Sequence, residues 1–177
     1  MATKWKIDPT HSEIQFKVRH LMISTVTGHF RQFNVDAETA SDDFASASNV
    51  KFTADIDSIT TSNEQRGGHL KSADFFDAEK YPQLKFEGSR YDGSGEEAKL
   101  HGQLTIKDVT RQVTLNVEYG GMVVDPYGQT KAGFTLDGKI SRQDFGLSWN
   151  AVTEAGQVVV SDDIKLHAEV QLVKQAE

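Results

Sequence analysis

Residues 13–20 read Glu-Ile-Gln-Phe-Lys-Val-Arg-His, and from Ile14 to Val18 every second residue is apolar between charged or polar neighbours. Because successive side chains of a β-strand point to opposite faces, this pattern predicts a strand with one dry and one wet face. The same period of two recurs in stretches that begin near residues 50, 84, 100, 113, 132 and 164. Two less regular strands are predicted near residues 4–8 and 28–36. The period indicates an all-β chain.

Short turn sequences separate these predicted strands. Residues 92–95, 107–110 and 125–128 each lie between two alternating stretches, as is typical of hairpins. Strands joined by such short links are antiparallel neighbours. About eight of them must hide their apolar faces in a sandwich or a closed barrel, and consecutive hairpins favour an antiparallel up-and-down β-barrel.

One long stretch, about residues 60–81, lacks the period of two. Ser62 followed three residues later by Gln65 resembles a capping box, and Pro82 cannot continue a helix. We therefore expect a short helical insertion at about 60–81 within a single barrel domain of residues 1–177. Long connections of this kind usually cover functional sites.

The composition excludes several function classes. The 177 residues carry a formal charge of −7 and contain no cysteine, which disfavours nucleic-acid binding and rules out thiol catalysis and cysteine-based zinc sites. No apolar run is long enough to span a membrane. Residues 1–9 lack an apolar leader, so we expect a cytoplasmic protein, although a mature periplasmic form with a replaced leader would read the same.

No catalytic motif stands out, and we expect neither an enzyme nor a cofactor. None of the six histidines is spaced for a local metal pair, so no metal site is expected. Asp8, His11 and Ser12 could suggest a triad, but such residues are common at a turn that contains proline, and nothing positions an oxyanion hole. His20 shares the inward parity of Phe16. It is either a hydrogen-bonded core histidine or a polar contact for a ligand head group.

Apolar residues that converge on the barrel interior are the candidate ligand-binding residues. Ordinary core packing is one interpretation. The other is a barrel that stays partly open, because barrels of about eight strands either just fill or hold one small ligand. Each buried methylene contributes about 0.8 kcal/mol, so a long apolar chain would gain much by entering. The candidates on strands are Phe16, Val18, Phe52, Phe86, Phe134 and Leu136, and those in connecting segments are Phe75, Phe76 and Phe145.

Several segments resemble the YceI-like family. Residues 5–20 are similar to its opening signature, which includes Trp5, Asp8, His11 and Ser12. Residues 66–77, Arg-Gly-Gly-His-Leu-Lys-Ser-Ala-Asp-Phe-Phe-Asp, are similar to its central helical signature, and residues 142–147 fit the segment before its last hairpin. Asp108 stands where a turn glycine is usual. Because aspartate tolerates a positive φ better than most residues, we expect that turn to survive.

The resemblance implies a lipocalin-like barrel that binds a polyisoprenoid or another long amphiphilic lipid, often as a homodimer, with roles such as transport or storage. Under this interpretation Arg66 and His69 join His20 as polar contacts near a head group, while capping and loop structure are an equal alternative for the first two. Two other functions stay open. One is an enzyme that acts on an isoprenoid or another lipid, with His20 as the base. The other is a filled barrel that serves as a partner-binding scaffold.

Overall fold

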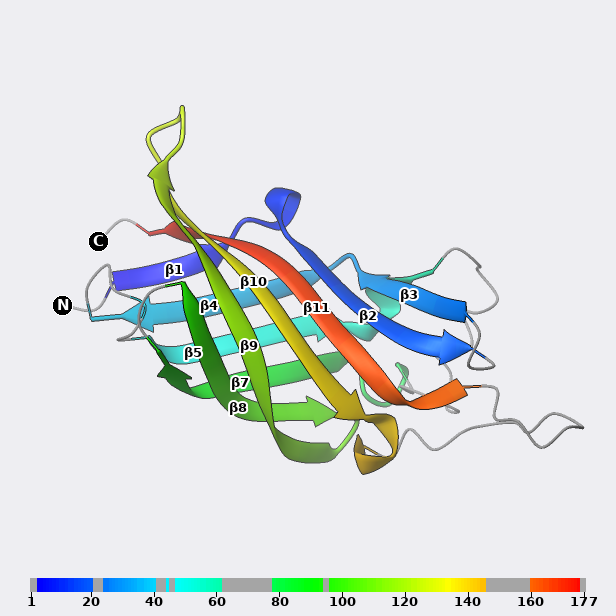
Figure 1. The fold of residues 1–177 in the computed structure, drawn as a ribbon. Helices are drawn as coiled ribbons and strands as arrows, with labels where there is room; N and C mark the ends of the chain where they lie inside the picture. The colour runs from blue at the N-terminus through cyan, green and yellow to red at the C-terminus, as the bar shows by residue number, and fades with distance from the viewer. Residues whose placement is uncertain are drawn as a thin grey trace, which may run out of the picture.

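The computed structural model describes residues 3–20, 24–40, 44, 47–61, 78–93, 96–145 and 160–175. Within these ranges the regular structure consists of strands and short 3-10 turns (Figure 1). The strands are β1 (Thr3–Ile7), β2 (Glu13–His20), β3 (Ser24–Phe30), β4 (Phe33–Thr39), β5 (Ser48–Asp55), β6 (Ile59–Thr60), β7 (Gln83–Asp92), β8 (Glu97–Ile106), β9 (Val109–Val124), β10 (Thr130–Ser141) and β11 (Val160–Lys174). The 3-10 turns are η1 (Pro9–His11), η3 (Ile56–Ser58) and η4 (Arg142–Phe145).

The strands close into a ring. Hydrogen-bonded neighbours follow the order β1, β4, β5, β7, β8, β9, β10 and β11, and β11 pairs with β1. At the other end, β2 takes the place beside β11, β3 pairs with β2, and β6 pairs with β3. The first six strands are thus three broken strands, β1–β2, β3–β4 and β5–β6. Each position is antiparallel to the next one along the chain, which confirms the up-and-down barrel of about eight strands.

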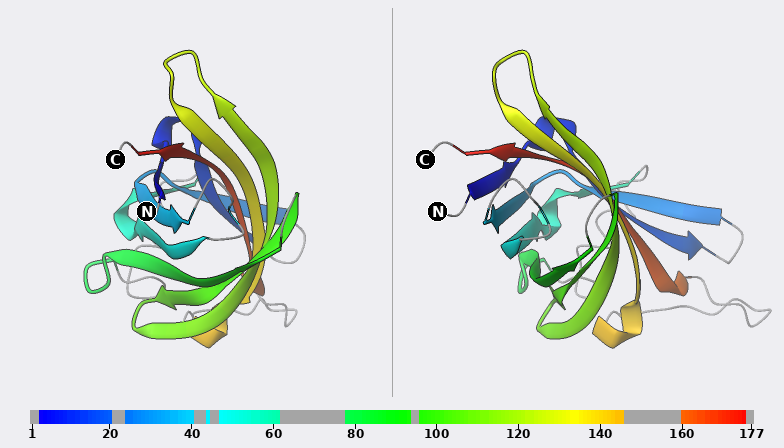
Figure 2. Two further views of the ribbon diagram at one scale, coloured as in Figure 1. Left: turned by 90° about the vertical axis from the view of Figure 1, so that its left-hand side faces the viewer. Right: turned by 60° about the vertical axis from the view of Figure 1, so that its left-hand side comes forward.

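The strands curve strongly around the interior. Figure 2 shows β8, β9 and β10, in green to yellow, wrapping around the barrel, and the β9–β10 hairpin projecting past its other elements. The apolar faces of the strands point into the barrel interior. In β8, for example, every second residue from Ala98 to Ile106 is buried. Gly28 allows one close approach inside. A Cβ there would lie 2.3 Å from Cζ of Phe16, so the ring lies against bare backbone.

The bend between β1 and β2 is fixed by polar contacts. Oδ1 of Asp8 accepts a hydrogen bond from the backbone N–H of Thr10 at 3.1 Å, and Pro9 begins the 3-10 turn. The backbone of Asp8 donates to the carbonyl of Gln171 at 2.8 Å, and the N–H of Gln171 donates to Oγ of Ser12 at 3.0 Å. These bonds anchor the interruption to β11, so the two half-strands form one wall.

Two local predictions have different outcomes. The helical insertion at about 60–81 falls mainly on residues 62–77, which lie outside the described residues. The turn between β8 and β9 is present, as expected from the sequence, but the positive φ does not lie at Asp108. Lys107 carries it, at 58°. Primed two-residue hairpin turns need a positive φ at their first central residue, and Lys107 supplies it here.

Candidate functional site: an apolar tube inside the barrel

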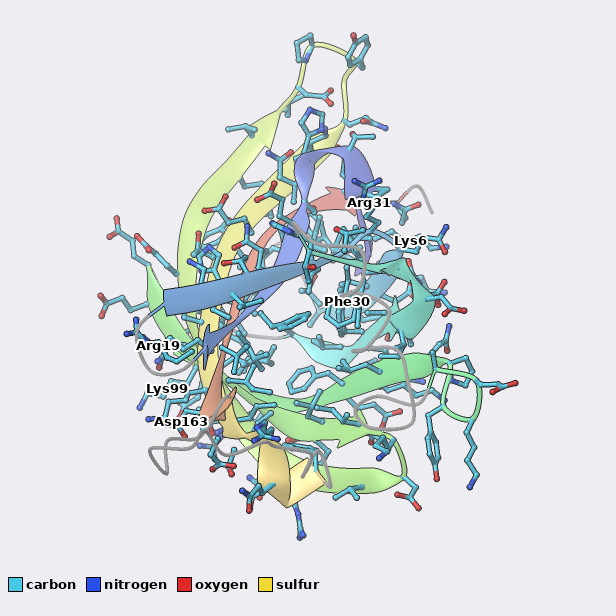
Figure 3. All side chains as sticks on the ribbon, turned by 90° about the vertical axis from the view of Figure 1, so that its right-hand side faces the viewer. Lys6, Arg19, Phe30, Arg31, Lys99 and Asp163 are labelled. Atoms are coloured by element: carbon cyan, nitrogen blue, oxygen red, sulfur yellow. The ribbon has the colours of Figure 1, made fainter. Side chains whose placement is uncertain are left out.

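Two adjacent apolar cavities lie inside the barrel. The larger has a volume of about 140 Å³ and the smaller about 80 Å³. Both are bounded by Val35, Val50, Leu100 and Leu136, so the two cavities are successive chambers of one tube. Figure 3 looks into the barrel and shows Phe30, which lines the larger chamber, in its interior.

Strand register places the lining of the larger chamber. Phe52 on β5 lies opposite Phe86 on β7, and Phe86 lies opposite Leu104 on β8. These three residues form an interior row across three strands, and all of them line the larger chamber. Phe86 and Leu104 are buried, whereas Phe52 keeps part of its surface exposed. An inward-facing aromatic side chain with remaining exposed surface is one that a guest molecule could cover.

An aromatic cluster lies beside the smaller chamber, at the end near β1. The ring of Phe44 lies 4.8 Å from that of Trp5 and 4.7 Å from that of Phe134, measured between centroids. The ring of Tyr119 lies 5.9 Å from Phe44. Nε1 of Trp5 donates a hydrogen bond to Oγ1 of Thr39 at 3.0 Å, which satisfies the buried indole N–H. Phe44 and Phe134 of this cluster line the smaller chamber.

Phe44 differs from most of the residues around the tube in where it lies in the chain. It belongs to the connection between β4 and β5, and it is 6% exposed. Apart from Phe44 and Ala47, the residues that line the two chambers lie on strands. This role could not be predicted from the sequence, because a lone phenylalanine between two strands has no period that indicates its direction.

The structure places the predicted binding residues in three ways. Phe52, Phe86, Phe134 and Leu136 line one or both chambers. Phe16, Val18 and Phe145 belong to the surrounding core or pack against it, and they do not line either chamber. His20 is described as a residue of β2, opposite Val160 of β11, whereas Arg66, His69, Phe75 and Phe76 lie outside the described residues.

The hypothetical triad is a structural feature of the bend instead. Nδ1 of His11 lies 2.8 Å from Oδ2 of Asp8, which resembles a base and its orienting acid. However, Oγ of Ser12 accepts from the backbone of Gln171, and the described residues show no hydrogen bond between Ser12 and His11. The side chain of His11 is 59% exposed, so these residues form no enclosed catalytic site.

A short ion network joins this bend to the projecting hairpin. Nζ of Lys131 lies 2.8 Å from Oδ2 of Asp8 and 3.5 Å from Oδ2 of Asp125. The hydrogen bond from Lys131 is the main reason that the pKa of Asp8 lies far below its usual range. The same bond is the main reason that the pKa of Lys131 is raised. The network holds the bend against the base of the β9–β10 hairpin, and none of its three residues lines either chamber.

At the opposite end, η4 carries a buried cation. Arg142 is 1% exposed, and its burial lowers the pKa of the guanidinium while the charge of Asp162 opposes that shift. Asp162 also accepts hydrogen bonds from Oγ of Ser141 and the backbone N–H of Gln143. These contacts hold η4 against the ends of β10 and β11.

In the described part of the chain, no three or more histidine, aspartate or glutamate side chains gather in a way that could hold a metal ion. Nor does that part contain a helix with the length and apolar character needed to cross a membrane.

Comparison with known proteins gives a consistent result. The family model of the YceI-like domain matches residues 5–172. A UPF0312 protein of Staphylococcus aureus strain N315 is 38% identical over 172 residues, which are 96% of each chain. The crystal structure of a Campylobacter jejuni YceI protein is 34% identical and covers 90% of each chain with a TM-score of 0.76.

More distant structures share the fold. Burkholderia cenocepacia BcnA is 20% identical and covers 93% of this chain and 98% of its own, with a TM-score of 0.79. A polyisoprenoid binding domain from Saccharophagus degradans is 14% identical and covers 97% and 98%, with a TM-score of 0.67. With a family model matched over nearly the whole chain and a relative of 38% identity, this chain belongs to the YceI-like family.

Proposed function

We propose that the protein binds the chain of a long amphiphilic lipid of the polyisoprenoid class inside the barrel, for transport or storage. The observation that carries the proposal is the apolar tube with its two chambers, and we propose that its inner end lies at Phe44, which lines the smaller one. A closed end inside and an apolar wall favour a ligand with one apolar end. A buried charge without a partner would be costly in this tube, so the polar end must stay outside it.

The chamber volumes bear on how such a chain would fit. Chambers of about 140 and 80 Å³ are smaller than the roughly 300–1,000 Å³ of typical small-molecule sites. A cavity near 150 Å³ in another protein stays dry and admits benzene, so the empty tube has room for part of a chain. A longer segment requires lining side chains to move. Phe52, Leu115 and Leu136 are only partly buried and are the residues expected to do so.

The comparisons support the ligand class. A polyisoprenoid binding domain has this fold, and the chain belongs to the YceI-like family. At 14% identity that domain supports the architecture of the site, and the ligand of this chain is inferred from its own apolar tube.

Native mass spectrometry tests the proposal. Protein purified from its host, and delipidated protein offered farnesol, should both show a bound isoprenoid, and solvent extraction should release it. The variant Leu136→Trp adds bulk where the two chambers meet and should lose the ligand at a stability cost of about 1–3 kcal/mol. Lys51→Gln changes an exposed residue on β5 and should keep it. A wild-type protein that never takes up a long-chain lipid contradicts the proposal.

Two other functions make different predictions. An enzyme that acts on the lipid would need a base, and His20→Ala should then abolish turnover. We propose binding without turnover, so a bound isoprenoid should be recovered chemically unchanged. A partner-binding scaffold needs no internal space, so the presence of the apolar tube argues against that function. We also propose a homodimer, which the same native spectra would show as twice the chain mass.

A further inference from the structure

The wall of the barrel contains a break between β9 and β10. Their pairing runs from Val124 opposite Thr130 down to Asn116 opposite Asp137, and the described residues continue it no further. Both strands continue beyond this point with their other neighbours. β9 stays paired with β8 as far as Val109, and β10 stays paired with β11 as far as Ser141. The residues 109–115 and 138–141 are therefore not joined by a backbone ladder.

The side chain of Leu115 lies at the start of this break. Gly138 lies on the inward parity of β10, and a Cβ at that position would lie 2.5 Å from Cδ2 of Leu115 on β9. Leu115 therefore covers the bare glycine. Farther along, Nε of Arg111 donates a hydrogen bond to the carbonyl of Asp144 at 3.1 Å, which links β9 to η4. Between these two contacts, a chain could cross the wall if Leu115 changed rotamer, with no strand-to-strand hydrogen bond to break.

A polar groove lies outside the same part of the wall. It has a volume of about 660 Å³, and its lining includes Thr114, Asn116 and Gly138 at the break. Leu166 and His167 line both this groove and the larger inner chamber. The apolar tube and the outer groove therefore lie on two sides of one stretch of wall.

A row of three lysines crosses the floor of the groove. Lys139 on β10 lies opposite Lys165 on β11, and Lys165 lies opposite Lys17 on β2. Directly opposed side chains on a sheet are close enough that like charges repel, which destabilises the sheet. Lys139 has a counter-ion, Asp163, at 3.2 Å. In the described part of the chain, Lys17 and Lys165 have neither a hydrogen bond nor an ion pair, and both line the groove.

The carboxylates along the next part of the groove have partners of their own. Oδ1 of Asp137 lies 2.6 Å from Nδ1 of His167, and Oε1 of Glu169 lies 3.7 Å from Nε2 of the same ring. Oε2 of Glu13 accepts a hydrogen bond from Gln15 at 3.2 Å. In the described part of the chain none of these carboxylates forms an ion pair with Lys17 or Lys165, so both ammonium groups remain available to an anion that enters the groove.

We propose that Lys17, Lys165 and Lys139 bind the anionic head group of the lipid, a phosphate or a carboxylate, and that its chain reaches the tube through the break between β9 and β10. The inference rests on the proposed function. Ammonium groups donate strong charge-assisted hydrogen bonds to such oxygens. The arrangement keeps the head-group charge in water while the chain lies in the apolar tube.

The test compares one chain with two head groups. Isothermal titration of delipidated protein with farnesyl monophosphate should give a Kd about tenfold below that for farnesol, and the difference should shrink with added salt. Lys17→Gln combined with Lys165→Gln should remove that advantage and leave farnesol binding unchanged. Lys51→Gln combined with Lys85→Gln removes two exposed lysines from β5 and β7 and should change neither affinity.

Three results would overturn the head-group site. The first is an equal affinity of the wild-type protein for the two ligands. The second is an equal loss of the farnesyl monophosphate advantage in the control variant, Lys51→Gln with Lys85→Gln. The third is tight binding of inorganic phosphate alone, which would indicate a site for free anions. In each of them the proposed function stands as long as farnesol binds, whereas binding of neither ligand overturns both proposals. Leu115→Ala should speed uptake of farnesyl monophosphate, while Leu84→Ala on β7, which also enlarges the chamber, should not. Equal acceleration in both variants would overturn the route through the break.

Discussion

Replacing Phe44 with alanine should remove the closed end of the tube. The side chain is 6% exposed and its ring packs between those of Trp5 and Phe134, at 4.8 and 4.7 Å. Truncation of a buried phenylalanine costs about 3–5 kcal/mol, and each aromatic pair lost accounts for about 0.5–1.5 kcal/mol of that beyond its buried area. Phe44 lies in a connection and the barrel ladders do not pass through it, so the strands should stay paired.

The same change should lengthen the chain that the protein accepts. Removing the ring joins its volume to the smaller chamber, and each additional buried methylene contributes about 0.8 kcal/mol. With a series of linear alcohols of increasing length, the affinity of the wild-type protein should stop rising at a certain length. In Phe44→Ala that limit should move to longer chains, and in Phe44→Trp to shorter ones.

Two assays check this prediction. Urea unfolding gives the change in stability, and competition titrations give the length limit. Phe145→Leu is the matched control, because Phe145 is 1% exposed but lies outside the lining of both chambers, so it should lose stability and keep the same limit. A cost below about 1 kcal/mol for Phe44→Ala would refute the packing argument. An unchanged limit in a folded variant would refute the role of Phe44 as the end of the tube.

Other predictions concern the frame of the barrel. Gly28→Ala places a Cβ 2.3 Å from Cζ of Phe16 and should lower the free energy of unfolding by about 1–3 kcal/mol in urea titrations, and a neutral effect would contradict that contact. Because the pKa of Asp8 is lower in the folded state, its ionised form stabilises the fold at pH values above its unfolded-state pKa of about 3.9. That stabilisation disappears as the pH falls through the folded-state pKa. Because the pKa of Lys131 is higher in the folded state, its charged form stabilises the fold at pH values below its unfolded-state pKa of about 10.4. This contribution disappears as the pH rises through the folded-state pKa. Lys131→Met should therefore lower the urea midpoint most between about pH 4 and 10, and a loss that persists undiminished in stronger acid would exclude the ion pair as its cause. We also propose that residues 1–177 fold as one unit, which a single unfolding transition should show.

The alternation of residues predicted the barrel well because each strand has one wet face. In β8, for example, the inward positions could be read directly from the sequence, and the structure buries them. Hairpin turns of two to four residues then fixed the neighbours, since such links allow only antiparallel pairing. The closure of β11 on β1 and β2 follows from the need to hide both edges of a sheet with one apolar face.

The site was less predictable than the fold, because it depends on the space that packed side chains leave and on where strand pairing stops. Phe134 lines a chamber and Phe16 does not, although both lie on dry faces of strands, because the space left between side chains depends on their packing. The role of Phe44 depends on the path of a connection. The break beside Gly138 depends on where two ladders stop, which a period of two does not show.

A crystal structure of protein purified from its own host tests the central claim most directly. The account predicts elongated density along Phe52, Phe86 and Leu136 that ends at Phe44, and a bound isoprenoid in mass analysis of the same crystals. An interior filled by the protein's own side chains, with no extractable lipid, would contradict it.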